Sequence, residues 1–78
     1  MYTYTYFMFK RRYGSPETGT YYSYDIVVYG PLYRRPVQIV RDVSTDGELV
    51  FRMITLFNEK GLSPEHLIEA VQGFLNME

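Results

Sequence analysis

His66 is the first side chain to consider for chemistry, because it is the only histidine in the chain. It lies next to Glu65 and three residues before Glu69, and a His and a Glu with that spacing on a helix can contact one metal ion. The carboxylate–histidine di-metal motif has the order Glu-x-x-His, however, and needs a second copy with further glutamates. A metal site requires three or four protein ligands. We therefore predict no metal site and no cofactor.

Nucleophilic catalysis would depend on a serine, because the chain has no cysteine. The nucleophile must lie within reach of a base, and the base must be oriented by a third group. Ser15 and Ser23 lie in a predicted turn and a predicted strand, whereas Ser44 and Ser63 lie near predicted helix starts, where Ser is a common N-cap. Ser63 and His66 are three residues apart, which is also the spacing between an N-cap and the third residue of its helix. Capping therefore explains this pair without a catalytic role. The six glycines are scattered and form no phosphate loop. We predict that the protein is not an enzyme.

The aromatic residues and the charges are unevenly distributed along the chain. All nine tyrosines lie within the first 33 residues. Residues 1–44 carry a formal charge of +3 and residues 45–78 a charge of −4, which gives the net charge of −1. A charge of +3 is small beside the basic surface of a duplex-DNA-binding domain. The net charge is also far from that of a DNA mimic.

A length of 78 residues, with 46% hydrophobic and 22% charged residues, predicts a single small domain over residues 1–78 with one two-layer core. The longest stretch without Lys, Arg, Asp or Glu has nine residues, Met1 to Phe9, against the roughly 20 that a membrane span needs. A secretory signal has its positive charge before the apolar stretch, whereas Lys10, Arg11 and Arg12 follow it. We expect a cytoplasmic protein with no membrane partner.

Three segments rich in aromatic and β-branched residues predict strands over residues 2–13, 20–29 and 37–43. The turn residues at 14–19 predict that the first two strands form an antiparallel hairpin.

The apolar residues of the hairpin predict its register. Opposing Phe9 to Tyr24 and Phe7 to Ile26 places the apolar sets of both strands on one face, as a buried face requires. The third strand would add three apolar residues to that face, with Arg41 at its rim. These three residues are Val37, Ile39 and Val43.

Residues 44–54 are compatible with two structures. Asp46-Gly47 is a hairpin signal that would make residues 48–54 a fourth strand. Thr45 followed by Glu48 is a capping box instead, with Asp46 in the first helical turn. Apolar residues then recur with helical spacing. They are Leu49, Val50, Met53, Ile54, Leu56 and Phe57. We favour a helix over residues 46–59 and keep the fourth strand as the alternative.

A second helix is predicted over residues 64–76. Gly61 suits the left-handed position that ends the first helix, and Ser63 and Pro64 suit the N-cap and the first position of the next. The apolar stripe of this helix consists of Leu67, Ile68, Val71, Phe74 and Leu75. The predicted fold class is α+β, with a three-stranded antiparallel sheet followed by two C-terminal helices packed on one face, in the order βββαα.

Several short motifs of the chain together resemble a short bacterial domain-of-unknown-function family. They are Tyr24-Asp25-Ile26, Asp42-Val43-Ser44-Thr45-Asp46 and Leu62-Ser63-Pro64-Glu65-His66-Leu67, followed by Val71 and Phe74-Leu75. The resemblance covers roughly residues 22–76 and departs from the family pattern at Gly47 and in the tyrosine-rich N-terminus. It implies a helix over residues 46–59 and a bacterial cytoplasmic origin. It implies no activity, so no functional residue is carried over.

The predicted register turns an aromatic face of the sheet away from the helices. It consists of Tyr4, Tyr6, Met8, Tyr21, Val27 and Tyr29. An exposed patch of this kind usually marks an interaction surface, and Tyr is frequent at binding hot spots. The alternative is a sheet whose outer tyrosines merely lie flat against it. We predict a non-enzymatic protein-interaction module that uses this face or a sheet edge for self-association or for binding a larger protein, for example as a regulator or inhibitor.

The alternative function is single-stranded nucleic-acid binding, with tyrosines as stacking platforms. The phosphates would contact Lys10, Arg11, Arg12, Arg34 and Arg35.

Overall fold

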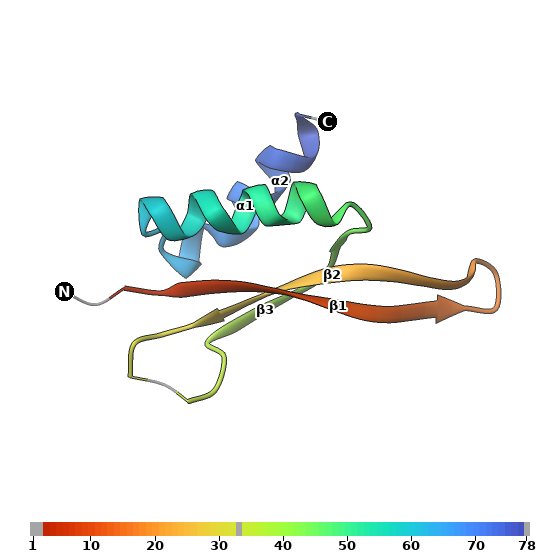
Figure 1. The fold of residues 1–78 in the computed structure, drawn as a ribbon, viewed down its shortest axis with the longest axis horizontal. Coiled ribbons are helices and arrows are strands. Elements are labelled where there is room, and N and C mark those ends of the chain that lie inside the picture. The colour runs from red at the N-terminus through yellow and green to blue at the C-terminus, as the bar shows by residue number, and fades with distance from the viewer. Residues whose placement is uncertain (1–2, 33, 78) are drawn as a thin grey trace.

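The computed structural model describes residues 3–32 and 34–77, and its elements follow one another in the predicted order βββαα. The strands are β1 (Thr5–Ser15), β2 (Gly19–Tyr29) and β3 (Gln38–Ser44). The helical elements are α1 (Gly47–Lys60), the 3-10 turn η1 (Pro64–His66) and α2 (Leu67–Asn76). The sheet is antiparallel with the strand order β1-β2-β3. Both α-helices lie over the same face of it (Figure 1), so the predicted fold class is confirmed.

Helix α1 confirms the helix at residues 46–59 and excludes the fourth strand. Its N-cap is Asp46 rather than Thr45, and the Asp46 carboxylate accepts hydrogen bonds from the backbone N–H groups of Glu48 and Leu49, both at 3.1 Å. Gly61 ends the helix in the left-handed conformation, with φ 61°. This conformation favours Gly because a Cβ would be strained there.

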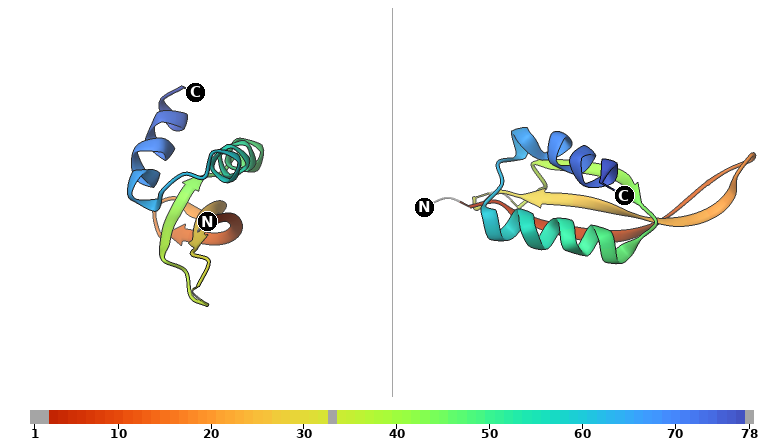
Figure 2. Two further views of the ribbon diagram at one scale, coloured as in Figure 1. Left: turned by 90° about the vertical axis from the view of Figure 1, so that its left-hand side faces the viewer. Right: turned by 90° about the horizontal axis from the view of Figure 1, so that it is seen from above.

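The second predicted helix begins with a 3-10 turn before it becomes α-helical at Leu67. Ser63 is the N-cap of this turn in backbone conformation, but its side chain makes no capping hydrogen bond. Only Leu67 and Val71 of the predicted stripe are buried, because α2 is angled away from α1 (Figure 2). Ile68 and Leu75 are exposed, as is Leu56 on α1.

The predicted register of the hairpin was wrong by one residue. Phe9 pairs with Asp25 rather than with Tyr24, and Phe7 pairs with Val27 rather than with Ile26. The strands are joined through only three residues, since Ser15 pairs with Gly19, and Gly19 has the positive φ of 72° typical of such a loop. A one-residue shift moves every side chain of one strand to the opposite face.

The core therefore contains the alternate set of β1 residues. Tyr6 is 1% exposed, and Tyr4 and Met8 pack partly buried against the same core, whereas Phe7 and Phe9 face away from the helices. From the other elements the core receives Ile26, Val28, Val43, Leu49, Val50, Met53, Ile54, Phe57, Leu67 and Val71. The Tyr6 hydroxyl donates to the Leu62 carbonyl at 2.6 Å, which satisfies the polar end of the ring.

Strand β3 presents different residues to the core than predicted. Val43 is buried as expected, but Ile39 pairs with Val27 on the outer face and Val37 is exposed. Val40 packs against the core instead. The pairing of β2 with β3 is irregular between Tyr24 and Ile26, and Asp42 has a φ of 52°, so β3 changes face there.

The β1–β2 hairpin is longer than the helices that cover it, and its far half projects beyond them (Figure 2). The molecule consequently measures 46 × 30 × 18 Å along its principal axes. Tyr22 lies on this half of the hairpin and is exposed. Lys10 lies over the Tyr22 ring, with its Nζ 5.1 Å from the centroid.

Candidate binding face of the sheet

The side of the sheet opposite the helices carries apolar and aromatic side chains that no other element of the described chain covers. We call it the open face. It consists of Phe7, Phe9 and Arg11 on β1, Asp25, Val27 and Tyr29 on β2, and Ile39 and Arg41 on β3. Phe7, Phe9 and Ile39 are 43%, 49% and 41% exposed. Contiguous exposed apolar surface is uncommon on a small protein unless it binds something.

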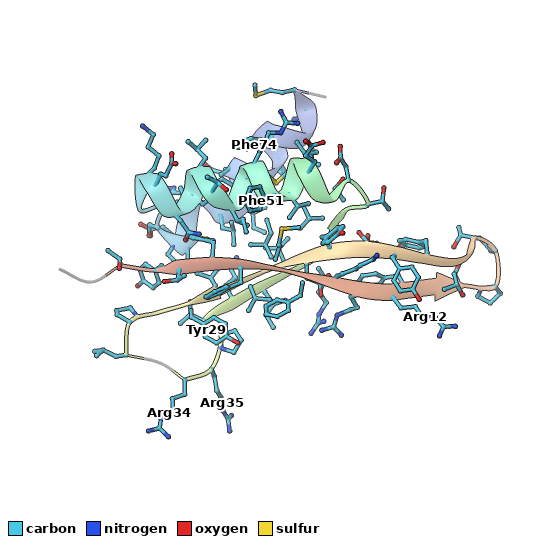
Figure 3. The ribbon with its side chains drawn as sticks, viewed as in Figure 1. Arg12, Tyr29, Arg34, Arg35, Phe51 and Phe74 are labelled. Carbon is cyan, nitrogen blue, oxygen red and sulfur yellow. The ribbon has the colours of Figure 1, made fainter. Side chains whose placement is uncertain are left out.

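The connection between β2 and β3 forms one wall of the open face. It leaves the sheet on the side away from the helices, and it carries Arg34 and Arg35 at its far end (Figures 1 and 3). A trough of about 360 Å³ lies between this wall and β1. It is lined by Phe9, Lys10, Arg11, Val27, Tyr29, Pro36 and Ile39. The lining is therefore mostly apolar, with cations at its border.

The aromatic rings of the open face are held by contacts with one another. Phe7 and Tyr29 meet edge to face, with ring centroids 5.7 Å apart. Farther along the hairpin, Tyr13 and Tyr21 stack at 5.9 Å. Val27 is buried beneath these neighbours although it lies on the open face. The Phe7 and Tyr29 rings thus support each other on the open face, and the Tyr13 and Tyr21 rings do so beyond it.

Asp25 is the acidic residue at the centre of the open face, and it is only 1% exposed. Its carboxylate accepts from Arg11 Nε at 2.8 Å, from the Asp42 backbone N–H at 2.9 Å and from the Tyr13 hydroxyl. Arg41 Nη1 lies 3.9 Å from the same carboxylate. These contacts connect all three strands and hold two arginines on the open face.

The hydrogen bonds to Asp25 also determine its ionisation. Burial by itself raises the pKa of the Asp25 carboxyl, but hydrogen bonds from Tyr13, the Asp42 backbone and Arg11 lower it, and the net effect is a pKa below the ordinary value of 3.8. The buried carboxylate is therefore charged at neutral pH and compensated by arginine. Burial and the hydrogen bond to Asp25 raise the pKa of the Tyr13 hydroxyl, so this hydroxyl remains a donor.

The charge difference between the two halves of the sequence becomes a difference between the two layers of the fold. The sheet and its loops carry Lys10, Arg11, Arg12, Arg34, Arg35 and Arg41. The helical elements carry Glu48, Glu59, Glu65 and Glu69. The small net charge of the chain therefore conceals a basic sheet side and an acidic helix side.

Half of the predicted protein-binding residues lie on the wrong face for that role. Tyr6 is buried and Tyr4 and Met8 pack against the core, because the register differs from the predicted one. A binding role for Tyr6 through an exposed ring is thereby excluded. Asn58 of α1 fixes this segment, since its side chain accepts from the Tyr6 N–H at 2.7 Å and donates to the Tyr6 carbonyl at 3.0 Å.

The other three predicted residues do share the outer side of the sheet. Val27 and Tyr29 belong to the open face itself, although Val27 is buried beneath its neighbours. Tyr21 lies farther along the hairpin, and its hydroxyl donates to Asp42 at 2.6 Å. Sequence reasoning missed Phe7, Phe9 and Ile39. The available signal was the three-residue loop at residues 16–18, followed by Gly19, since its length sets which residues of β1 face outward.

The predicted cations do not all gather at one place. Arg11 lies on the open face, and Arg34 and Arg35 extend from the loop beside it (Figure 3). Lys10 reaches the border of the trough and also contacts Tyr22. Arg12 lies on the projecting hairpin (Figure 3). Arg41 was placed at the rim of the covered face by the sequence and joins the open face instead.

The residues first considered for chemistry are not assembled into a catalytic arrangement. The His66 ring approaches Glu65 at 3.7 Å with both side chains mostly exposed. Ser44 accepts from the Asp46 N–H at 3.0 Å, and Ser15 contacts Thr18. Ser23 is buried, and its hydroxyl has no hydrogen-bond partner among the described residues. Within residues 3–32 and 34–77, no group of three or more His, Asp or Glu side chains is placed to hold a metal ion.

A second hollow, of about 320 Å³, lies on the helix side. It is lined by Leu56, Phe57, Lys60, Leu62, Ala70, Gly73, Phe74 and Met77. The Phe57 and Phe74 rings meet there edge to face at 5.8 Å. Its lining offers a partner apolar contact but, apart from Lys60, no charged group. Among the described residues, no helix combines the length and the apolar character that a membrane crossing requires.

Comparison of the chain with protein families, with curated proteins and with solved structures gave no match.

Proposed function

We propose that the chain is a non-enzymatic interaction module that binds a larger partner through the open face of its sheet. The observation that carries the proposal is the exposure of Phe7, Phe9 and Ile39 on a face with no covering layer. In a domain of this size each exposed apolar ring has an unfavourable hydration free energy, which a partner relieves. Helices cover the other face of the same sheet, so the two faces have different roles.

The composition of the open face is that of a binding surface. Phe, Tyr and Arg are enriched at the centres of protein interfaces, and aliphatic neighbours exclude water around them. Phe9, Tyr29 and Arg11 supply the first kind of residue, and Val27 and Ile39 supply the second. The trough beside them would accept one apolar side chain of the partner.

Site-specific photocrosslinking tests the proposal. The photoreactive residue p-benzoylphenylalanine is introduced in place of Phe9 in one variant and in place of Phe51 in a control, and both chains are irradiated in the cell that naturally makes them. Phe51 is 59% exposed but lies on α1, on the opposite side of the molecule (Figure 3). We expect discrete adducts from position 9 and not from position 51. Adducts that are absent at both positions, or the same at both, would contradict the proposal.

The cations around the open face favour a second candidate function, the binding of single-stranded nucleic acid. Arg11 and Arg41 lie on the face, and Arg34 and Arg35 lie beside it. Aromatic rings bordered by arginines are the usual surface for unpaired bases and their phosphates. Treatment of the position-9 adduct with nuclease separates the two candidates, because only an adduct to nucleic acid is shortened.

A further inference from the structure

The two candidate partners make different demands on the charge of the open face. A protein partner needs apolar contact, and cations around the face favour it only if its own surface is acidic. A nucleic acid needs positive charge next to exposed rings. The number and position of the cations on the open face therefore help to distinguish the two candidate partners.

Arginines outnumber carboxylates on and around the open face. Arg11, Arg41, Arg34 and Arg35 accompany two acidic residues, the buried Asp25 and, at the border of the face, Asp42, whose carboxylate accepts from the Tyr21 hydroxyl. Asp25 is buried beneath Arg11 and Arg41, while the side chains of these arginines are 53% and 55% exposed. Arg11 uses Nε toward Asp25, and a guanidinium has five N–H donors, so further donors point outward. Arg34 and Arg35 add two exposed cations on the adjoining loop.

A second copy of the chain, joined open face to open face, is a poor partner for this surface. A two-fold interface places the same patch of both subunits together. Two open faces would then bring the arginines of one copy close to those of the other. Apart from Asp25 and Asp42, the acidic side chains that could compensate them lie mostly on the helical elements, on the far side of each molecule. Charge therefore disfavours a two-fold dimer through the open face.

The aromatic residues have the arrangement that unpaired bases require. Phe7 and Phe9 are alternate residues of one strand, so their Cα atoms are about 6.8 Å apart and their rings share a face. This is about twice the 3.4 Å per nucleotide of a stacked strand. Consecutive bases drawn apart to this spacing can each lie on one ring, and Tyr29, in contact with Phe7, adds a third ring. Duplex DNA keeps its bases paired and would not reach these rings.

We infer that the partner of the open face is a single-stranded nucleic acid, whose bases stack on Phe7, Phe9 and Tyr29 and whose phosphates contact Arg11, Arg41, Arg34 and Arg35. The inference rests on the proposed function, because it uses the same face. It differs from the nucleic-acid function that the sequence predicted, because Phe7 and Phe9 replace the tyrosines of β1 as stacking residues and Arg41 joins the cations.

Fluorescence anisotropy with labelled single-stranded oligonucleotides tests the inference. The probes are a 12-mer of thymidine and a 12-mer of uridine, which distinguish DNA from RNA, and the controls are a 12-base-pair duplex and polyglutamate. We expect saturable binding of at least one single strand and weaker binding of the duplex and of polyglutamate. If four cations contact phosphates, the slope of log affinity against log salt is about −2.8, and affinity falls about 50-fold between 50 and 200 mM salt.

Matched variants separate stacking from charge. Phe7→Ser and Phe9→Ser should each weaken binding roughly 5- to 140-fold, the effect of losing one base–aromatic stack, whereas Phe51→Ser should not. The double variant Arg34→Ser/Arg35→Ser should reduce the salt slope to about −1.4, and Lys60→Gln on α1 should leave it unchanged. Circular dichroism checks that each variant is folded. We expect all of them to fold, because Phe7, Phe9, Arg34 and Arg35 are exposed.

Several results would overturn the inference. The first is no binding of either single strand at millimolar protein. The second is binding of polyglutamate as tight as that of the single strands. The third is an equal loss of oligonucleotide affinity for Phe9→Ser and Phe51→Ser. A position-9 photoadduct that resists nuclease, together with no oligonucleotide binding, would refute a nucleic-acid partner while leaving the open face as the interaction surface. Absence of that adduct would contradict the proposed function itself.

Discussion

Asp25→Asn is the substitution that tests how the open face is held together. An Asn at this position keeps one oxygen that accepts from the Tyr13 hydroxyl and from the Asp42 backbone N–H. Its NH₂ group, however, would face the Nε–H of Arg11, and two donors cannot form a hydrogen bond. A hydrogen bond to a charged group contributes roughly 1.5–3 kcal/mol to stability. Because Arg11 is half exposed and water screens its charge, we take a value in the lower half of this range. The free energy of unfolding at pH 7 should fall by about 2 kcal/mol.

The effect of Asp25→Asn should depend on pH. The pKa of Asp25 in the folded chain lies below its ordinary value of 3.8, so the carboxylate contributes its full stabilisation above about pH 3.8. That contribution is lost as the pH falls through the folded pKa. The Asn variant has no carboxyl at this position, so its disadvantage relative to the wild type should shrink below pH 3.8.

Urea unfolding followed by circular dichroism at pH 7, 5 and 2.5 measures both effects. The matched control is Asp42→Asn, because Asp42 is exposed, accepts from one Tyr21 hydroxyl and has a φ of 52° that Asn tolerates. We expect the control to change the free energy of unfolding by no more than about 0.5 kcal/mol. An equal loss for the two variants at pH 7, or a loss for Asp25→Asn that is the same at pH 2.5, would refute this account of Asp25.

Two further substitutions test the core side of the sheet by urea unfolding. Gly47→Ala should lower the free energy of unfolding by about 1–2 kcal/mol, because the new Cβ would lie 2.8 Å from Tyr24 Cζ. Adding Tyr24→Leu should remove most of this loss. A Gly47→Ala variant more stable than the wild type would contradict this packing. Tyr6→Phe should cost about 1 kcal/mol at pH 7, because it leaves the Leu62 carbonyl without its donor. Burial, with a smaller effect of Tyr4, raises the pKa of Tyr6 to about 12, so the wild type should lose stability as the pH rises from 10 through 12. A Tyr6→Phe variant with the same alkaline loss would show that another group causes it.

The helical half of the fold could be predicted because its signals are local. Gly61 could be assigned from its residue type and its neighbours, and the structure confirms the end of α1 there. The start was less certain because Thr45 and Asp46 are both good N-caps one residue apart, and the structure selects Asp46. The burial of α2 could not be predicted, because it depends on the angle between two helices rather than on the pattern within one.

The candidate site could not be predicted correctly because it depends on one long-range choice, the register of the hairpin. Every residue from Tyr4 to Phe9 except Thr5 is aromatic or apolar, so both faces of β1 are suitable for a core. The apolar pattern from which we predicted the register is therefore compatible with both registers, and the observed one leaves a three-residue loop before Gly19. On β3, the positive φ at Asp42 added a second change of face that the sequence pattern did not indicate.

At β1 the structure also favours the face of the sheet over the strand edge as the candidate binding surface. An edge binds a partner strand through unpaired backbone N–H and C=O groups. On β1 the outward backbone groups of Tyr6 are taken by Asn58, which bonds both of them from α1. Farther along β1, Lys10 and Arg12 are exposed, and charged residues on an edge strand are a common means of preventing strand addition. A partner of this side of the sheet consequently meets side chains rather than backbone, and the exposed ones are the rings and arginines of the open face.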